Sequence, residues 1–221
     1  WPIATPVLYY AFGKQVYSDS LVLTEDDFFD MAWAYLNKLH DQCVVRCEMF
    51  FDPQTHTERG VPMASVIQGL HRACLAARQR WNLHAELILC FLRHLSQEQA
   101  WATLEQALPF RHLFIGVGLD SSEVGHPPEK FARVFARCRD LGLRIVAHAG
   151  EEGPPSYIVS ALDVLGAERI DHGVQAEQDP ALMQRLAQQR TPLTVCPLSN
   201  LKLCVVPDLR EHNVGRLLEA G

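Results

Sequence analysis

Apolar and polar positions follow one another along the chain in blocks that predict helices and strands in turn. Apolar residues at helical spacing predict helices over residues 24–42, 62–81, 96–108, 127–142, 155–166, 179–189 and 211–221. Short, continuously apolar runs predict six strands, over residues 44–51, 85–92, 113–119, 143–147, 168–173 and 193–198. Residues 1–23 have no clear period and are expected to form an irregular arm, so a single domain is expected over residues 24–221.

Several predicted helices carry specific start and stop signals. Thr24, Ser96 and Asp179 stand where a side-chain oxygen can accept a hydrogen bond from the first free amides of a helix. Gly142 and Gly166 stand just after a predicted last turn, where glycine adopts the left-handed conformation without a Cβ clash. The helix boundaries are therefore predicted from side-chain chemistry as well as from spacing.

The predicted strands are apolar throughout rather than alternating, which is typical of a parallel sheet covered by helices on both faces. A doubly wound open sheet and a (β/α)8 barrel both fit this pattern, but the Gly-rich dinucleotide fingerprint is absent. Polar residues follow one strand after another: Asp52, Arg93, His94, Asp120, His148, His172, Ser199 and Asn200. In a barrel these strand ends converge where catalysis occurs, so we favour a TIM-type barrel of which six of eight strands are present.

Composition narrows the class of protein further. The chain has 221 residues, of which 48% are hydrophobic and 21% charged, and its formal net charge is −6. Its Lys and Arg residues do not cluster, so no nucleic-acid partner is expected, and no apolar run is long enough to predict a membrane span. The seven cysteines form no C-x-x-C pair, which excludes a zinc ribbon and favours reduced thiols in a cytoplasmic protein.

Two histidines and a glutamate are the strongest candidates for chemistry. His148 closes one apolar strand and His172 closes the next, so their rings are expected to face one small volume. Gly150 permits a sharp turn that would aim Glu151 back toward these rings. A core histidine at 148 and a helix-dipole role for Glu151 are the structural alternatives. Together the three residues suggest a metal-activated water with a carboxyl acid and an imidazole base, although zinc sites usually take three protein ligands.

Long segments of the sequence also resemble a known family. At "AHAGEE", "ERIDHGV" and "TVCPLSNLKL" the chain resembles the adenosine and adenine deaminase family, zinc-dependent hydrolases built on a (β/α)8 barrel. The segments "MFFDPQTHTERGVP", "CFLRHLS" and "GVGLDSSEVGHPPEKF" look like the adenine deaminase branch, which acts on the free base. The match runs over residues 24–221.

The resemblance implies a role for each candidate residue. His148 matches a zinc ligand, Glu151 the general acid that protonates N1 of the purine, and His172 the imidazole that orients and deprotonates the attacking water. The implied cofactor is one Zn²⁺ per complete active site. The segment "LDSSEVG" matches one that contacts the purine edge, which makes three residues substrate-binding candidates: Asp120, Ser122 and Glu123. For Glu123 a solvated loop glutamate is the alternative.

The sequence also departs from the family pattern. The H-x-H motif of the first family strand and the S-D-D motif of the eighth are absent, so strands one and eight of the barrel are expected to be missing. We therefore expect these 221 residues alone to be inactive. The implied reaction is hydrolysis of adenine to hypoxanthine and ammonia in purine salvage, with a small-molecule purine and water as partners, and the sequence leaves the oligomeric state open. An adenosine deaminase and a non-catalytic purine-binding relative remain the alternatives.

Overall fold

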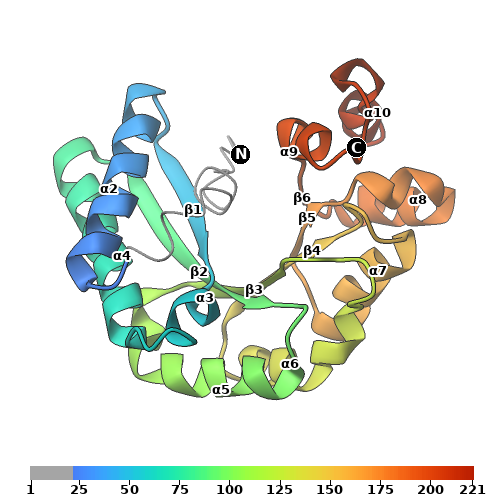
Figure 1. Ribbon diagram of the computed structural model, residues 1–221. Helices are drawn as coiled ribbons and strands as arrows, with labels where there is room; N and C mark the ends of the chain where they lie inside the picture. Colours follow the sequence, from blue (N-terminus) through green and yellow to red (C-terminus); the bar gives the residue numbers. More distant parts are fainter. Residues whose placement is uncertain (1–21) are drawn as a thin grey trace. The chain divides into compact units, whose positions relative to one another are not determined.

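The computed structural model describes residues 22–221 (Figure 1), so the arm predicted over residues 1–23 lies almost entirely outside them. The described chain divides into two compact units. Of the described residues, the first unit holds 22–91 together with 101–116, and the second holds 92–100 and 117–221. The single domain over residues 24–221 stays a prediction, and each unit is described by itself.

The first unit is built on two parallel strands and a pair of helices. Strand β1 (Arg46–Phe51) pairs in register with β2 (His84–Leu92). Helices α2 (Glu25–Asp41) and α4 (Met63–Trp81) lie side by side in Figure 1. Three further elements complete the unit or lead into it: α3 (Pro53–Thr57), α5 (Gln97–Ala107) and a 3-10 helix (Leu108–Leu113).

The two helices of this unit approach closely at Gly69. A Cβ atom there would lie 2.3 Å from the carbonyl oxygen of Glu25 and 2.7 Å from Cβ of Phe28. Glycine is therefore required by the contact between the helices and not by its own backbone angles. The α2 and α4 residues that are buried in the unit are mostly apolar, and they include Phe28, Ala32, Leu36, Val66, Ile67, Leu70, Ala73 and Ala77.

The second unit contains the other four strands, with β3 beginning at its boundary. The strands β3 (Gly116–Asp120), β4 (Arg144–Ala149), β5 (Arg169–His172) and β6 (Leu193–Thr194) are neighbours in this order, and β4, β5 and β6 pair in parallel. Helical segments separate these strands and follow the last of them (Figure 1). These are 3-10 helices at Pro128–Phe131, Val174–Gln178 and Leu209–Glu211, a π-helix at Ala161–Leu165, and helices α6 (Ala132–Asp140), α7 (Pro155–Ser160), α8 (Pro180–Gln189), α9 (Pro197–Lys202) and α10 (Val214–Glu219).

The predicted helix boundaries are confirmed where side chains define them. The Thr24 hydroxyl accepts from the Asp27 amide while the Asp27 carboxylate accepts from the Thr24 amide, which completes a capping box. Ser96 accepts from an amide of α5, and Asp179 accepts from two amides of α8. Gly142 and Gly166 have φ angles of 71° and 75°, as a left-handed helix end requires.

The last predicted strand is shorter than its apolar run. The run 193–198 was expected to be one strand containing Cys196, but β6 ends at Thr194 and Cys196 lies outside it. Pro197 lacks an amide hydrogen and has a φ angle that suits the first turn of a helix, so α9 begins there instead. The prediction that Cys196 lies within a strand was wrong for this reason.

Six strands alternating with helices confirm the predicted α/β fold class. Among the described residues, no helix is both long and apolar enough to span a membrane. Within the second unit, most of the buried polar side chains lie at or just beyond the carboxyl ends of strands. They include Asp120, Glu123, Glu151, Asp171, His172, Ser199 and Asn200.

Candidate active site

The two predicted histidines face one another at the ends of β4 and β5. The parallel register pairs His148 with Asp171 and Ala149 with His172. The two imidazole ring centroids lie 5.0 Å apart. The expectation that adjacent strands bring these rings to one small volume is therefore met. His172 also has a φ of 71°, an unusual backbone conformation for a non-glycine residue and one that is found preferentially at functional sites.

Both imidazoles are held in the neutral form. Burial lowers the pKa of His172 to about 3, and the adjacent His148 adds to this shift while Asp171 opposes it. Burial also lowers the pKa of His148 far below 6.5, helped by the cations of Arg93 and Arg169. A neutral imidazole has a nitrogen lone pair that can accept a proton or bind a metal ion.

The turn after β4 returns Glu151 toward the histidines. Gly150 has a φ of 68°, and a Cβ atom there would lie 2.4 Å from Cδ1 of Ile158. Any side chain at this position would therefore be strained and would also clash. The turn places Oε1 of Glu151 3.1 Å from Nδ1 of His172. The structure thus brings together Glu151, His172 and His148, as the sequence predicted.

Glu151 is a buried carboxyl group with a raised pKa. Burial is the largest cause, and the negative charges of Glu123 and Glu152 add to it, so that its pKa lies at about 7. Hydrogen bonds from Asn200 Nδ2 at 2.9 Å and from Ser199 Oγ at 3.5 Å partly oppose the shift. A carboxyl group with such a pKa can donate a proton near neutral pH.

Asn200 is fully buried, and its amide orientation follows from a chain of hydrogen bonds. The Val214 amide donates to Nδ1 of His212, so Nε2 of the neutral ring carries the hydrogen. This Nε2 donates to Oδ1 of Asn200 at 3.0 Å, which turns Nδ2 of Asn200 toward Glu151. Sequence analysis identified Asn200 as a polar residue beyond a strand but gave it no role, because its partners come from distant segments.

The three predicted substrate-binding residues have different surroundings. Asp120 is the buried last residue of β3, and its carbonyl oxygen accepts from the Arg93 amide. Ser122 is exposed. The Glu123 side chain is only 2% exposed, and its carboxylate accepts hydrogen bonds from backbone amides of residues 150–153. Glu123 is therefore not a solvated loop residue, and substrate contact by any of the three stays a prediction.

Arg93 is a further buried group that sequence analysis left without a role. Its guanidinium donates to the carbonyl oxygens of His126 at 2.9 Å and His148 at 2.6 Å. These bonds tie the loop after β3 to the end of β4. The side chain also lies over the ring of Tyr157 at 5.7 Å. A buried cation that joins two carbonyl groups fixes the spacing of the segments that carry Glu123 and His148.

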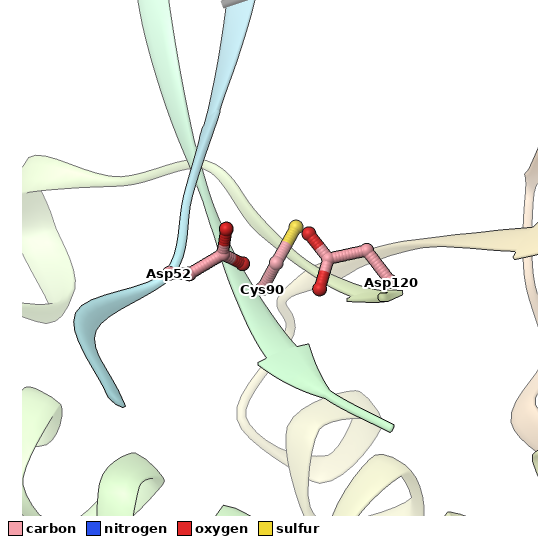
Figure 2. A group of neighbouring side chains, drawn as sticks. All are labelled: Asp52, Cys90 and Asp120. Atoms are coloured by element: carbon pink, nitrogen blue, oxygen red, sulfur yellow. The ribbon is translucent and has the colours of Figure 1, made fainter. Parts of the chain in front are cut away.

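Polar groups also lie near the strands of the first unit. Asp52 follows β1 and Cys90 lies in β2, and their ligand atoms are within 4.8 Å of one another (Figure 2). One carboxylate and one thiol supply fewer donors than the three protein ligands that a catalytic zinc usually takes. These two residues alone therefore do not define a metal site. Figure 2 also labels Asp120, which belongs to the second unit.

His148 has the chemistry of a zinc ligand. Its imidazole is neutral, it sits at a strand end, and only 21% of its side chain is exposed. Zinc binds neutral imidazole nitrogen readily, so His148 fits one position of the expected coordination shell. Oδ2 of Asp171 lies 3.7 Å from Nδ1 of His148, which is close enough for an electrostatic contact but too far for a hydrogen bond.

Parallel strands alternating with helices, with buried imidazoles and a carboxyl group at their carboxyl ends, fit the class of α/β-barrel proteins. Comparison with known proteins then identifies the family. Residues 9–221 match the model of the adenosine deaminase family, and the chain belongs to that family.

Relatives with high sequence identity refine this assignment. A protein named adenine deaminase from Geotalea uraniireducens is 66% identical over 202 residues, which cover 91% of this chain and 57% of that protein. Another of the same name from Acinetobacter baylyi is 61% identical over 214 residues, which cover 97% of this chain and 63% of that protein. The predicted adenine deaminase branch is thus confirmed, and the chain spans about three-fifths of the length of these relatives.

Solved structures confirm the barrel class. The adenine deaminase from Arthrobacter aurescens matches with a TM-score of 0.88 and 45% identity, over 90% of this chain and 61% of that chain. An amidohydrolase from Burkholderia ambifaria, solved with bound Zn, matches with a TM-score of 0.84 and 28% identity, over 91% of this chain and 57% of that chain. The six strands described here are therefore part of a TIM-type barrel of the hydrolase type, as predicted.

Proposed function

We propose that the protein hydrolyses adenine to hypoxanthine and ammonia, as a step of purine salvage. The observation that carries the proposal is the buried pair of Glu151 and His172, 3.1 Å apart, in which Glu151 has a pKa of about 7. The high identity to relatives named adenine deaminase supports adenine as the substrate. The seven free cysteines support a cytoplasmic location.

The contacts of Glu151 suggest how the two proton-transfer groups divide their work. Three donors converge on its Oε1: Asn200 Nδ2, Ser199 Oγ and, when it carries the hydrogen, Nδ1 of His172. In this arrangement the acidic proton of Glu151 resides on Oε2, where it can reach the substrate. Nε2 of His172 then has the lone pair that accepts a proton from water.

The reaction follows from these two groups. The water oxygen bonds to C6 of adenine while one water proton passes to Nε2 of His172, and Glu151 donates a proton to N1. The proton on His172 then passes to the 6-amino group, and the C6–N bond breaks to release ammonia. The remaining hydroxyl proton returns to Glu151, which leaves hypoxanthine and restores both groups.

We propose one Zn²⁺ per complete active site, with His148 as one of its ligands. A bound zinc ion would lower the pKa of the attacking water. The neutral imidazole of His148 would contribute a nitrogen ligand, held in orientation by its neighbours at the end of β4. His148 is the one residue to which we assign the role of a zinc ligand.

Steady-state kinetics of the intact, zinc-supplied protein tests the proposal. We expect hypoxanthine and ammonia to appear in equal amounts from adenine, and kcat/KM for adenine to exceed that for adenosine. A higher kcat/KM for adenosine would assign the nucleoside as substrate instead. Purine binding without any turnover would indicate a non-catalytic relative and overturn the proposal.

A further inference from the structure

We propose that Glu123 is a positioning residue, whose carboxylate holds the loop of residues 150–153 and so fixes Glu151 at the reacting purine. This inference rests on the proposed function of Glu151 as the proton donor. It assigns Glu123 a different task from the substrate contact that the family resemblance implies.

A single carboxylate accepts hydrogen bonds from four consecutive backbone amides. The Gly150 amide donates to Oε1 at 2.5 Å. The amides of Glu151, Glu152 and Gly153 donate to Oε2 at 2.9, 2.8 and 2.9 Å. Successive amides that converge in this way form a concave anion-binding site in the backbone, and here the anion is a side chain of the same protein.

These bonds engage both oxygens of the carboxylate group. A carboxylate has two oxygens with about four lone-pair sites in total, and four amides face them. Oε2 accepts three of the four bonds, so a purine N–H that bonded to this oxygen would displace an amide of the loop.

Close packing leaves Glu123 little freedom to move. A Cβ atom on Gly153 would lie 2.7 Å from Oε1 of Glu123 and 2.7 Å from Cδ2 of Tyr157. On its other side, the loop that carries Glu123 is anchored by its own backbone bond from His126 and by the Arg93 guanidinium on the His126 carbonyl oxygen. The contacts of His126 and Arg93 therefore fix the loop that carries Glu123, while the Glu123 carboxylate binds residues 150–153.

The same carboxylate influences the acid directly through its charge. After burial, the negative charge of Glu123 is the largest cause that raises the pKa of Glu151, ahead of Glu152. The other groups that face Glu151 are His172 from β5 and the neutral side chains of Ser199 and Asn200 from α9. Loss of the Glu123 charge should thus shift the titration of Glu151 to lower pH.

The pH profile of kcat in the intact protein tests the inference, with Glu123→Gln and a matched control. Glu152→Gln is the control, because it removes the same charge from an exposed side chain of the same loop. For Glu123→Gln we expect kcat to fall roughly 10- to 100-fold, the size expected when a reacting group is misplaced by about 1 Å, with little change in KM. The loss of activity near pH 7 should also move to lower pH, while Glu152→Gln changes both quantities much less.

Hydrogen exchange of the loop amides provides a second measurement that does not depend on activity. In the folded wild-type protein the amides of residues 150–153 should be protected, and in Glu123→Gln they should exchange at least about 10-fold faster. If the wild-type protein does not deaminate adenine, the proposed function fails while the exchange result still tests the hold on the loop.

Specific results would overturn the inference. A large rise in KM with unchanged kcat and unchanged loop exchange would make Glu123 a substrate contact, and no change in any quantity would leave it without a role. If Glu123→Gln does not fold, Gly153→Ala replaces it, because the added methyl group displaces the Glu123 carboxylate without removing its charge. In that variant kcat should fall and loop exchange should accelerate; unchanged values for both would contradict the inference.

Discussion

One charged cluster of the first unit and one of the second have different surroundings. In the first unit, Arg72 on α4 pairs with Glu25 and Asp26 of α2 at 2.5 and 2.9 Å, yet 46% of the Arg72 side chain is exposed. In the second unit, Glu123 is 2% exposed and satisfied by four amides. Water screens the first set of contacts and is excluded from the second.

The exposed ion pairs add little to the stability of the structure around them, whereas the buried hydrogen bonds fix its geometry. The α2–α4 pair is held by a continuous apolar contact, so its surface ion pairs add little. In the second unit, removing one partner of a buried polar group leaves the other unsatisfied in a medium of low dielectric constant. Substitutions at buried polar sites of the second unit should therefore affect geometry and catalysis, and substitutions at exposed polar sites of the first unit should affect stability slightly.

The largest effect is expected for Glu151→Gln. The amide keeps the shape of the side chain but cannot donate an acidic proton, so kcat should fall by roughly 10²- to 10⁴-fold. Glu152→Gln in the same loop should retain most activity, since its side chain is exposed. Turnover of adenine by both variants measures this difference, and an unchanged kcat in Glu151→Gln would refute its assignment as the acid.

Stability should also depend on pH through Glu151. Its pKa is about 7 when folded and near 4.5 when unfolded, so the folded protein binds the proton more tightly. The stabilisation is complete below pH 4.5 and is lost as pH rises through 7, by up to roughly 3 kcal/mol. Urea unfolding at pH 5 and pH 8 should show this loss in the wild type relative to Glu151→Gln. Parallel pH dependence in the two proteins would contradict the raised pKa.

Asn200→Ala is expected to have an intermediate effect on both stability and activity. It leaves the His212 donor unsatisfied and removes a hydrogen bond to Glu151, so the free energy of unfolding should fall by about 1–3 kcal/mol. Asn213→Ala is the matched control, because Asn213 is also buried but bonds to Val174 and Glu177 instead. Both variants should be less stable than the wild type. When turnover is divided by the concentration of folded protein, only Asn200→Ala should have a lower kcat.

The smallest effect is expected in the first unit. Thr24→Ala removes the capping box of α2, and the free energy of unfolding should fall by about 1 kcal/mol. Neither kcat nor its pH profile should change, since among residues 22–221 the hydrogen bonds of the Thr24 hydroxyl join it to Asp27 at the start of its own helix. Denaturant unfolding together with adenine turnover checks both statements. A changed pH profile would contradict the expectation that this substitution in the first unit leaves catalysis by the second unit unaffected.

The sequence by itself determined the local elements and the main candidates for chemistry. Apolar periodicity and end signals at Thr24, Asp179 and Gly166 depend on interactions within a few residues, which a sequence displays directly. The convergence of His148, Glu151 and His172 could also be predicted, because parallel pairing of successive strands brings their ends together. Continuous apolarity alone overestimated the last strand, where the backbone chemistry of Pro197 prevailed.

Only the tertiary structure decided which other polar residues support the acid. Glu123 binds amides 27 to 30 residues away. Every residue except proline has a backbone amide, so the sequence does not show which amides a distant carboxylate will bind. Asn200 is oriented through His212, whose own tautomer depends on the amide of Val214. Arg93 binds the carbonyl oxygens of His126 and His148. These contacts join side chains to distant backbone, so they exist only once the strands and loops of the second unit are packed together.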